Sequence, residues 1–245
     1  MFVEAGRMTH RSDRNSAAQD KGAFLGENDK VTYLGGTYQF SPALITSLYT
    51  SKADDLWRRH NLGINHTAEL GNGMALNTDL SHYHTSDRSD GSDLGNKATS
   101  LALTLTSGYH AITGAYQRMS GDSGYEYFDG AWYLANSVQY LDFNAKDERS
   151  WHAAYQYDFA GAGIPGLGFT ARYIRGSNID TDAYAGATSD TRWERDFALD
   201  YTIQQGALAG LNLKWMNATV RQDRNIDGGD VDENRVVASY TWNLL

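Results

Sequence analysis

Four basic residues of this chain, Arg59, Arg172, Lys214 and Arg235, have the chemistry and the positions to guide an anion. Each stands in a stretch where apolar and polar residues alternate, so its side chain projects to the side opposite its apolar neighbours. Arg suits a carboxylate because its planar fork donates to both oxygens at once. Fixed cations spaced along a low-dielectric wall lower the barrier for an anion and pass it from site to site. The four residues therefore predict a basic track.

The apolar neighbours that set the phase of these stretches are Leu62 and Ile64 for Arg59, Phe169 and Tyr173 for Arg172, Leu213 and Trp215 for Lys214, and Val236 and Tyr240 for Arg235. Arg7 is a further candidate, although its own stretch alternates with less contrast. The alternative interpretation is that the cations are ordinary hydrated charges, paired with Asp79, Glu194 or Asp196.

Catalytic patterns are weak in this sequence. Ser137, His152 and Asp142 can be combined into a triad on paper, but a chain with seven His always offers such a choice. No nucleophile elbow, phosphate loop or HExxH motif occurs. We therefore predict that the protein is not an enzyme, with an outer-membrane hydrolase as an alternative.

Metal and cofactor patterns are weak as well. His82 and His84 share one face, but no third ligand is evident, and their phase with Leu80 predicts an outward position near a rim. The acidic run 227–233 lacks the spaced acids and terminal Glu of an EF-hand loop, so it is predicted to be a solvated turn. Neither a metal nor a cofactor is predicted.

The alternation itself is clearest at 151–159 and 193–203. In the first stretch Trp151, Tyr155 and Phe159 fall on one side of an extended chain, and His152 and Asp158 fall on the other. An aromatic and aliphatic outer face with a charged or small inner face is typical of a barrel with lipid outside and water inside. We therefore predict an antiparallel membrane β-barrel.

The composition is compatible with that fold. The chain has 245 residues, and no apolar run approaches the ~20 residues of a transmembrane helix. Sixteen Tyr, six Trp and 25 Gly suit interfacial girdles and tight turns, and only two Pro suit long paired strands. The absence of Cys excludes disulfides and thiolate sites, and a net charge of −9 disfavours a nucleic-acid partner.

Twelve strands are expected, at 1–10, 30–40, 43–50, 56–69, 74–84, 97–107, 109–118, 150–160, 167–177, 192–205, 211–221 and 233–245. Long polar connectors are expected at 11–29, 85–96, 119–149, 178–191 and 222–232. Short connectors alternate with them, and only 51–55 breaks the rule. Such alternation is typical of barrels with tight periplasmic turns and long external loops.

The connector 119–149 is too long to serve only as a link, since loops beyond ~12–15 residues are usually functional or disordered. Its second half, 132–143, is too aromatic for disorder. Two interpretations remain: a loop folded into the lumen, or an external hairpin packed on itself.

Several stretches resemble the OprD family, the outer-membrane carboxylate channels of Gram-negative bacteria. They are Leu134-Ala135-Asn136-Ser137-Val138-Gln139-Tyr140 with Asp142-Phe143-Asn144, Ser150-Trp151, Gly163-Ile164-Pro165-Gly166-Leu167 with Arg172-Tyr173-Ile174, Glu194-Arg195-Asp196 with Tyr201 and Gln204-Gln205-Gly206, and Glu233-Asn234-Arg235 before Tyr240. Their order and spacing match over most of 30–245.

The resemblance implies an eighteen-stranded monomeric barrel in the bacterial outer membrane, in contact with its lipid. Residues 1–245 would form the carboxyl-terminal part of that single domain, without the first six strands. Segment 119–149 would be the inward-folded constriction loop, with Asn136, Ser137 and Asp142 opposite the basic track. The implied function is passive diffusion of small carboxylate-bearing nutrients.

Three alternatives stay open at this point. Twelve strands could close into a narrower barrel, because an open sheet leaves unpaired N–H and C=O groups at its edges, which is costly in lipid. A soluble β-sandwich that binds a carbohydrate or another ligand would pack the aromatic faces against a second sheet. The opening residues 1–4 also lack a secretory signal pattern, so either the chain is a mature fragment or the membrane interpretation fails.

Overall fold

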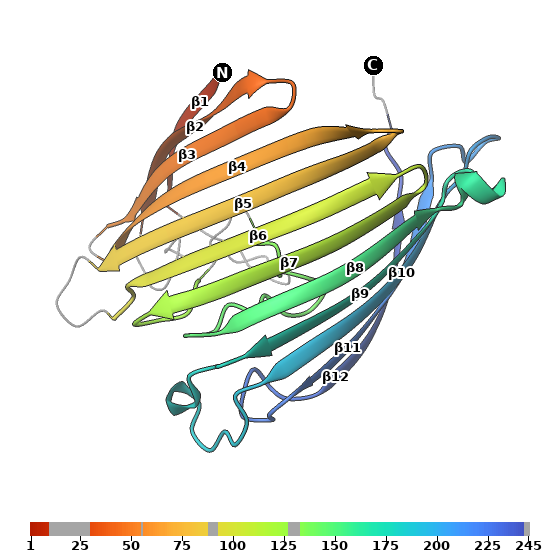
Figure 1. The fold of residues 1–245 in the computed structure, drawn as a ribbon. Helices are drawn as coiled ribbons and strands as arrows, with labels where there is room; N and C mark the ends of the chain where they lie inside the picture. The colour runs from red at the N-terminus through yellow and green to blue at the C-terminus, as the bar shows by residue number, and fades with distance from the viewer. Residues whose placement is uncertain (10–29, 55, 88–92, 127–132, 243–245) are drawn as a thin grey trace.

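The computed structural model describes residues 1–9, 30–54, 56–87, 93–126 and 133–242, which fold into twelve antiparallel strands (Figure 1). The strands are β1 (Phe2–Met8), β2 (Val31–Ser41), β3 (Leu44–Ala53), β4 (Trp57–Gly71), β5 (Met74–Asp87), β6 (Asn96–Ser107), β7 (His110–Gly121), β8 (Arg149–Asp158), β9 (Leu167–Ser177), β10 (Arg192–Thr202), β11 (Asn212–Gln222) and β12 (Val231–Ser239). The prediction of an all-β chain with twelve strands is confirmed. The expected connector 11–29, residues 127–132 of the expected loop and residues 243–245 of the last expected strand lie outside the described residues.

The strands form one sheet in sequence order, from β1 to β12. Within the described ranges no ladder joins β1 to β12, so these two strands are the edges of an open, curved sheet (Figure 1). The alternative of twelve strands closed into a narrower barrel is therefore not what the structure adopts. The β-sandwich is also wrong, because a sandwich requires two sheets packed face to face.

The tight turns lie at one end of the sheet and most of the longer connections lie at the other, with the short connection between β3 and β4 as an exception. Residues 72–73 reverse the chain between β4 and β5, and Asn72 (φ 53°) and Gly73 (φ 72°) adopt the left-handed backbone that such a tight turn needs. Residues 122–148, between β7 and β8, belong to the other end. Two short 3₁₀ helices, η1 (Phe159–Ala162) and η2 (Thr181–Ala183), lie in connections. In the described part of the chain, no helix is long and apolar enough to cross a membrane.

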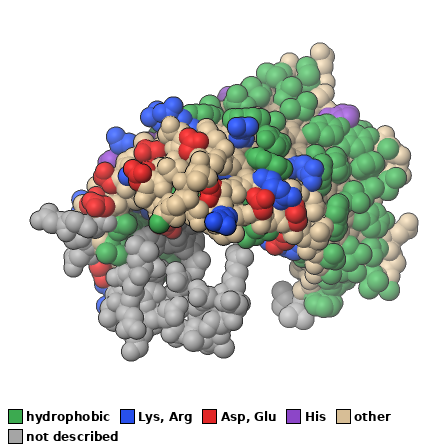
Figure 2. Space-filling view, turned by 90° about the horizontal axis from the view of Figure 1, so that it is seen from below, with side chains coloured by type: hydrophobic (Ala, Val, Ile, Leu, Met, Phe, Trp, Pro, Cys, Tyr) green, Lys and Arg blue, Asp and Glu red, His purple; other side chains and the backbone are tan. Residues whose placement is uncertain are grey.

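The two faces of the sheet differ as the alternation predicted. On the convex face Trp151 is 46% exposed and Tyr155 is 37% exposed, whereas His152 between them is 7% exposed on the concave face. Figure 2, seen from below Figure 1, shows hydrophobic side chains over the side of the sheet and charged side chains over the end with the long connections. Leu, Ile and Val on this outer surface suit contact with lipid tails.

The pairing register assigns two further residues to the convex face. Arg7 pairs with Thr32, and Thr32 pairs with Lys52 on the next strand. Lys52 in turn pairs with Arg58, which faces outward on β4. Arg7 is therefore not part of an inward basic track, and its guanidinium lies 3.8 Å from Asp54. His82, opposite the outward Leu62, faces outward as predicted.

Part of the hydrophobic core lies between the concave face and residues 133–148 of the connection between β7 and β8. One cluster joins Leu141 and Phe143 of this connection to Ile174 of β9 and Val220 of β11. Phe143, Ile174 and Val220 are fully buried. Inward apolar side chains on β9 and β11 are thus covered by the chain's own loop.

Candidate functional site: the concave face and its loop

The described part of the connection between β7 and β8, residues 122–126 and 133–148, lies against the concave face of the sheet. Gln117, fully buried on β7, fastens it at three points. Its amide nitrogen donates to the carbonyl oxygens of Asp142 (3.0 Å) and Phe143 (2.9 Å). Its amide oxygen accepts from the backbone N–H of Asn136 (3.0 Å). The loop therefore folds toward the inside of the curved sheet.

Asn136, predicted as a polar group facing the basic track, is fully buried instead. Its side-chain nitrogen donates to the Ser150 hydroxyl (2.8 Å), and its oxygen lies 2.8 Å from Nδ1 of His152. Because these contacts occupy the amide on both sides, Asn136 anchors the loop to β8 and presents no open surface.

Ser137 and Asp142 are half-buried, and the Ser137 hydroxyl donates to the Asp142 carboxylate. His152 contacts Asn136 instead of either residue. The three groups of the hypothetical triad are therefore not arranged as a nucleophile–base–acid relay.

Glu194 is a second anchor, on β10, and it is fully buried. Its two carboxylate oxygens accept from the backbone N–H groups of Tyr140 and Leu141, each at 2.8 Å. Gln139 next to them donates to Glu233 of β12 at 3.0 Å. The tip of the loop is thereby held against β10 and β12, which lie far from β7 in the sheet order.

Arg59, the first residue of the predicted track, lies beneath the loop and is only 3% exposed. Its guanidinium donates to the Thr85 hydroxyl (2.9 Å) and to the carbonyl of Glu126 (2.9 Å). It also lies over the rings of Trp57 (4.5 Å) and Tyr125 (4.4 Å). Arg59 faces inward as the phase predicted, but it holds the loop and is closed to a passing solute.

The other three predicted cations lie on successive inward rows of the sheet. Arg172 is in one row with Asp196, and the next row toward the short connections contains Arg235 opposite Met216. The row after that contains Lys214. Successive inward positions on a strand are about 6.6–6.8 Å apart, so the rows that contain the three cations are separated by that distance along the strands.

Two of these cations have acidic partners. The Arg172 guanidinium lies 3.5 Å from Asp196, and Arg235 lies 2.7 Å from Glu233. Lys214 is opposite Asp200 in the register, and no ion pair within 4.0 Å joins it to another described residue. The wall is thus a mixed track in which Lys214 is the least neutralised cation.

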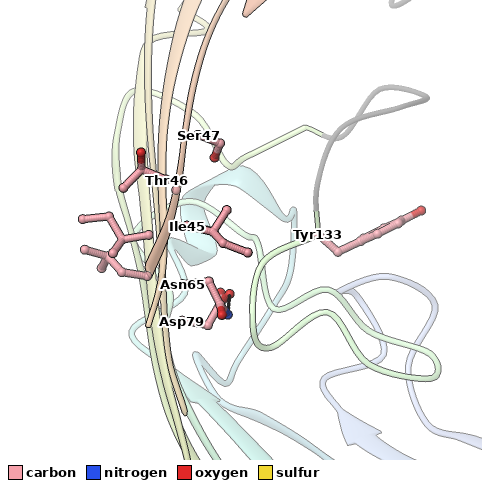
Figure 3. A pocket seen from close by; sticks show the side chains of 10 residues that line it. Ile45, Thr46, Ser47, Asn65, Asp79 and Tyr133 are labelled. Carbon is pink, nitrogen blue, oxygen red and sulfur yellow. Dashed lines mark hydrogen bonds between the residues drawn. The ribbon is translucent and has the colours of Figure 1, made fainter. Parts of the chain in front are cut away.

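A small hollow lies on another part of the wall, formed by β3, β4 and β5. It has a volume of about 190 Å³. Figure 3 shows Ser47, Asn65 and Asp79 projecting into it, with Tyr133 of the loop across the gap and Thr46 on the opposite face of the sheet. Asn65 donates to Asp79 at 3.0 Å, so this side offers hydrogen-bonding groups and negative charge.

The residues that sequence reasoning missed are the loop anchors Gln117, Glu194 and Glu233. The sequence pattern predicts Glu194 only as a partner of a lumen cation. The available signal was that each is an inward polar residue on the half of its strand nearest the long connections. In the described part of the chain, no group of three or more His, Asp or Glu side chains could hold a metal ion.

A model of outer membrane porins of the OprD family matches residues 1–244 of this sequence. The chain belongs to the OprD family. As an OprD-family protein it is located in the outer membrane. Its curved sheet with an apolar convex face is the architecture that such a location requires.

Two curated relatives resemble this OprD-family chain. It is 31% identical to Porin D of Pseudomonas aeruginosa over 99% of this chain and 61% of that protein. It is 28% identical to the porin-like protein GalP of Pseudomonas putida, over the whole of this chain and 60% of that protein. The chain thus spans about three fifths of the length of each.

Solved structures agree with the fold. The crystal structure of P. aeruginosa OpdQ superposes with a TM-score of 0.87 at 37% identity, over 99% of this chain and 66% of that one. The structure of P. aeruginosa OpdK with vanillate superposes with a TM-score of 0.85 at 29% identity, over 97% of this chain and 64% of that one. The twelve strands therefore correspond to part of a larger OprD-family barrel.

Proposed function

We propose that this protein forms part of a monomeric outer-membrane channel for passive diffusion of small carboxylate-bearing nutrients. The observation that carries the proposal is the series of Arg172, Arg235 and Lys214 on successive inward rows of β9, β12 and β11. A solute moving down the wall meets a new cation at each step. No cofactor or energy source enters this mechanism, because the solute moves down its own gradient.

The charge balance suits transit better than tight binding. An entering carboxylate loses part of its hydration, and the cations and neighbouring polar groups replace that hydration. Asp196 and Glu233 share the charge of Arg172 and Arg235, which keeps each step weak enough for release. Conduction requires this balance between entry and exit.

The loop has a place in the same proposal. We infer that segment 119–149 is the constriction of the channel. Its tip, at Gln139 to Leu141, is held by Glu194, one inward row from Arg172, and by Glu233, in the same row as Arg172. A narrow point beside the first cation would favour small anions over large ones.

The relatives support a carboxylate as the substrate class. OpdK, at 29% identity, has been crystallised with vanillate, which is an aromatic carboxylate. The relatives are porins, which also favours a channel over the hydrolase alternative.

The proposal is tested with the complete channel in a planar bilayer, by measuring the reversal potential in a KCl gradient at low salt. We expect the triple variant Arg172→Gln/Lys214→Gln/Arg235→Gln to lose anion preference and to slow vanillate uptake into liposomes. The matched control is Arg195→Gln, because Arg195 is on the outward face of β10 and donates to Thr219 at 3.0 Å. An unchanged reversal potential in the triple variant, or cation preference in the unmodified channel, would refute the proposal.

A further inference from the structure

Four cations form a patch on the convex face, at the end of the sheet with the long connections. Lys97, Arg118, Arg149 and Arg175 stand on the consecutive strands β6, β7, β8 and β9, and all four are exposed. The register places them together: Arg118 is directly opposite Arg149. Lys97 is diagonal to Arg118, and Arg175 is diagonal to Arg149.

This arrangement is unfavourable for the protein alone. Like charges directly opposite each other in a sheet destabilise it. The outward-facing positions of β6 to β9 contain no Asp or Glu. No ion pair within 4.0 Å links any of the four cations to another described residue. The patch therefore concentrates positive charge that the described residues do not neutralise.

Two outward cations elsewhere on the sheet have acidic partners. Arg7 lies 3.8 Å from Asp54, and Arg221 lies 3.1 Å from Asp232. Outward Lys52 and Arg58, opposite each other on β3 and β4, have no ion pair to another described residue either. The patch therefore differs in its size, because its four cations adjoin one another on four consecutive strands.

The depth of the patch in the membrane follows from the aromatic residues next to it. Tyr116 and Trp151 are opposite each other on β7 and β8, one outward position closer to the sheet centre than Arg118 and Arg149. Trp151 also packs on Tyr173 at 5.7 Å between ring centroids. Exposed Trp and Tyr side chains mark the level where acyl chains meet headgroups. The cations stand one outward position, about 6.8 Å along the strands, beyond that level, among the headgroups.

We propose that Lys97, Arg118, Arg149 and Arg175 bind the phosphate groups of an outer-leaflet membrane lipid. The long connections face the exterior in outer-membrane barrels, which places the patch in the outer leaflet. Arg forks donate two parallel hydrogen bonds to a phosphate, and a phosphate between Arg118 and Arg149 turns their repulsion into attraction. The lipid would attach to the outside of the barrel, independently of the solute path on the concave face.

The test compares lipid binding to the complete channel by native mass spectrometry in detergent. The probes are lipid A with both phosphates, the same lipid with its phosphates removed, and inorganic phosphate alone. We expect Arg118→Gln/Arg149→Gln to bind bisphosphorylated lipid A about tenfold more weakly than the unmodified channel. The two proteins should bind the dephosphorylated lipid equally. The control variant Lys146→Gln/Arg224→Gln removes the same charge from loops and should bind as the unmodified channel does.

The unfolding temperature gives a second readout, because the difference between the variant and the unmodified channel should change sign when lipid is added. Without lipid, Arg118→Gln/Arg149→Gln should unfold at a higher temperature than the unmodified channel, because the repulsion is gone. With bisphosphorylated lipid A the order should reverse. The proposal would be overturned if Arg118→Gln/Arg149→Gln and the unmodified channel bound bisphosphorylated lipid A equally. It would also be overturned if the unmodified channel bound the bisphosphorylated and the dephosphorylated lipid equally. Binding of inorganic phosphate with no preference for the lipid would overturn the assignment to a membrane lipid.

Discussion

At the scale of single residues, arginines that look alike in the sequence have different roles because they lie at different depths. Arg192 is 1% exposed and forms two ion pairs. One is with Glu148 (2.6 Å), at the end of the loop between β7 and β8, and the other is with Asp227 (2.7 Å), between β11 and β12. Arg221 makes a similar pair with Asp232, but both side chains are in water. A buried ion that loses its partner stays desolvated and uncompensated, whereas an exposed ion is rehydrated.

Replacing Arg192 should therefore cost far more stability than replacing Arg221. We expect Arg192→Met to lower the free energy of unfolding by about 3–5 kcal/mol, because Glu148 would be left buried without a cationic partner. Arg221→Met should lower it by about 0.2–1 kcal/mol. Urea unfolding of both variants in phospholipid vesicles measures the two values. Equal losses would show that burial of the Arg192 pair has no energetic weight.

At the scale of elements, the long connections are organised parts of the fold. Residues 133–148 follow the concave face from β7 to β12, held mainly by side chains of the strands. The connections 178–191 and 223–230 also hold each other, since Asp223 accepts from the backbone and hydroxyl of Thr188, each at 2.8 Å. Such anchoring keeps a loop in one position without a disulfide.

Removing the Glu194 anchor should loosen the tip of the loop. In Glu194→Ala the N–H groups of Tyr140 and Leu141 lose their acceptors, so the tip should move and the open-channel current should become noisier and larger. Single-channel recording in a planar bilayer measures both quantities. The control is Thr170→Ala, because Thr170 faces inward on β9 but makes no hydrogen bond to the described part of the loop. A quiet trace of unchanged conductance in Glu194→Ala would show that Glu194 does not position the tip.

The contact between the two external connections should resist acid. Hydrogen bonds from the N–H of Asn225, and then from Thr188, lower the pKa of Asp223 from its ordinary value of 3.8 to about 2. A lowered pKa means that ionised Asp223 favours the folded contact. That contribution is complete above the ordinary value and is lost as the pH falls through about 2.

Hydrogen exchange of the Thr188 and Asn225 amides between pH 5 and pH 2 checks this expectation. Protection should persist at pH 3 and disappear near pH 2. In Asp223→Asn the protection of both amides should be weaker at every pH. It should also show no loss near pH 2, because the Asn side chain does not titrate. Loss of protection already at pH 4 would contradict the assignment.

At the scale of the whole molecule, the sheet separates two environments. On the convex face, β6 presents Leu101, Leu103 and Leu105, each about two-fifths exposed. Ala102, between the first two, faces inward and is opposite Asp79. One face requires lipid and the other tolerates charge and water. The same substitution should thus have opposite consequences on neighbouring residues.

A lysine at Leu103 should cost about 2–4 kcal/mol of folding free energy in a bilayer, because it would lie near the midplane. A lysine at Ala102 should cost much less, because Asp79 is available to it. The folded fraction in phospholipid vesicles, read from heat-modifiable gel mobility, compares the variants. Equal loss in Leu103→Lys and Ala102→Lys would contradict the assignment of the two faces.

The sequence by itself determined the strands, the two faces and the family. Side-chain direction in a strand has a period of two residues and depends on the local chain only, so the phase of Trp151 and Tyr155 was sufficient to place His152 inside. The same reasoning placed Arg172, Lys214 and Arg235 on the inner side. It failed for Arg7, where residues 1–8 alternate too weakly to define a phase.

Only the tertiary structure decided which inward residues are open and which are covered. Arg59 and Asn136 are buried because residues 122–126 and 133–148 turn back onto the concave face, and Glu194 meets Tyr140 from 54 residues away. No local pattern encodes the path of such a loop. That path depends on hydrogen bonds between residues distant in the sequence, which form only after the sheet has brought β7, β8, β10 and β12 into one curved wall.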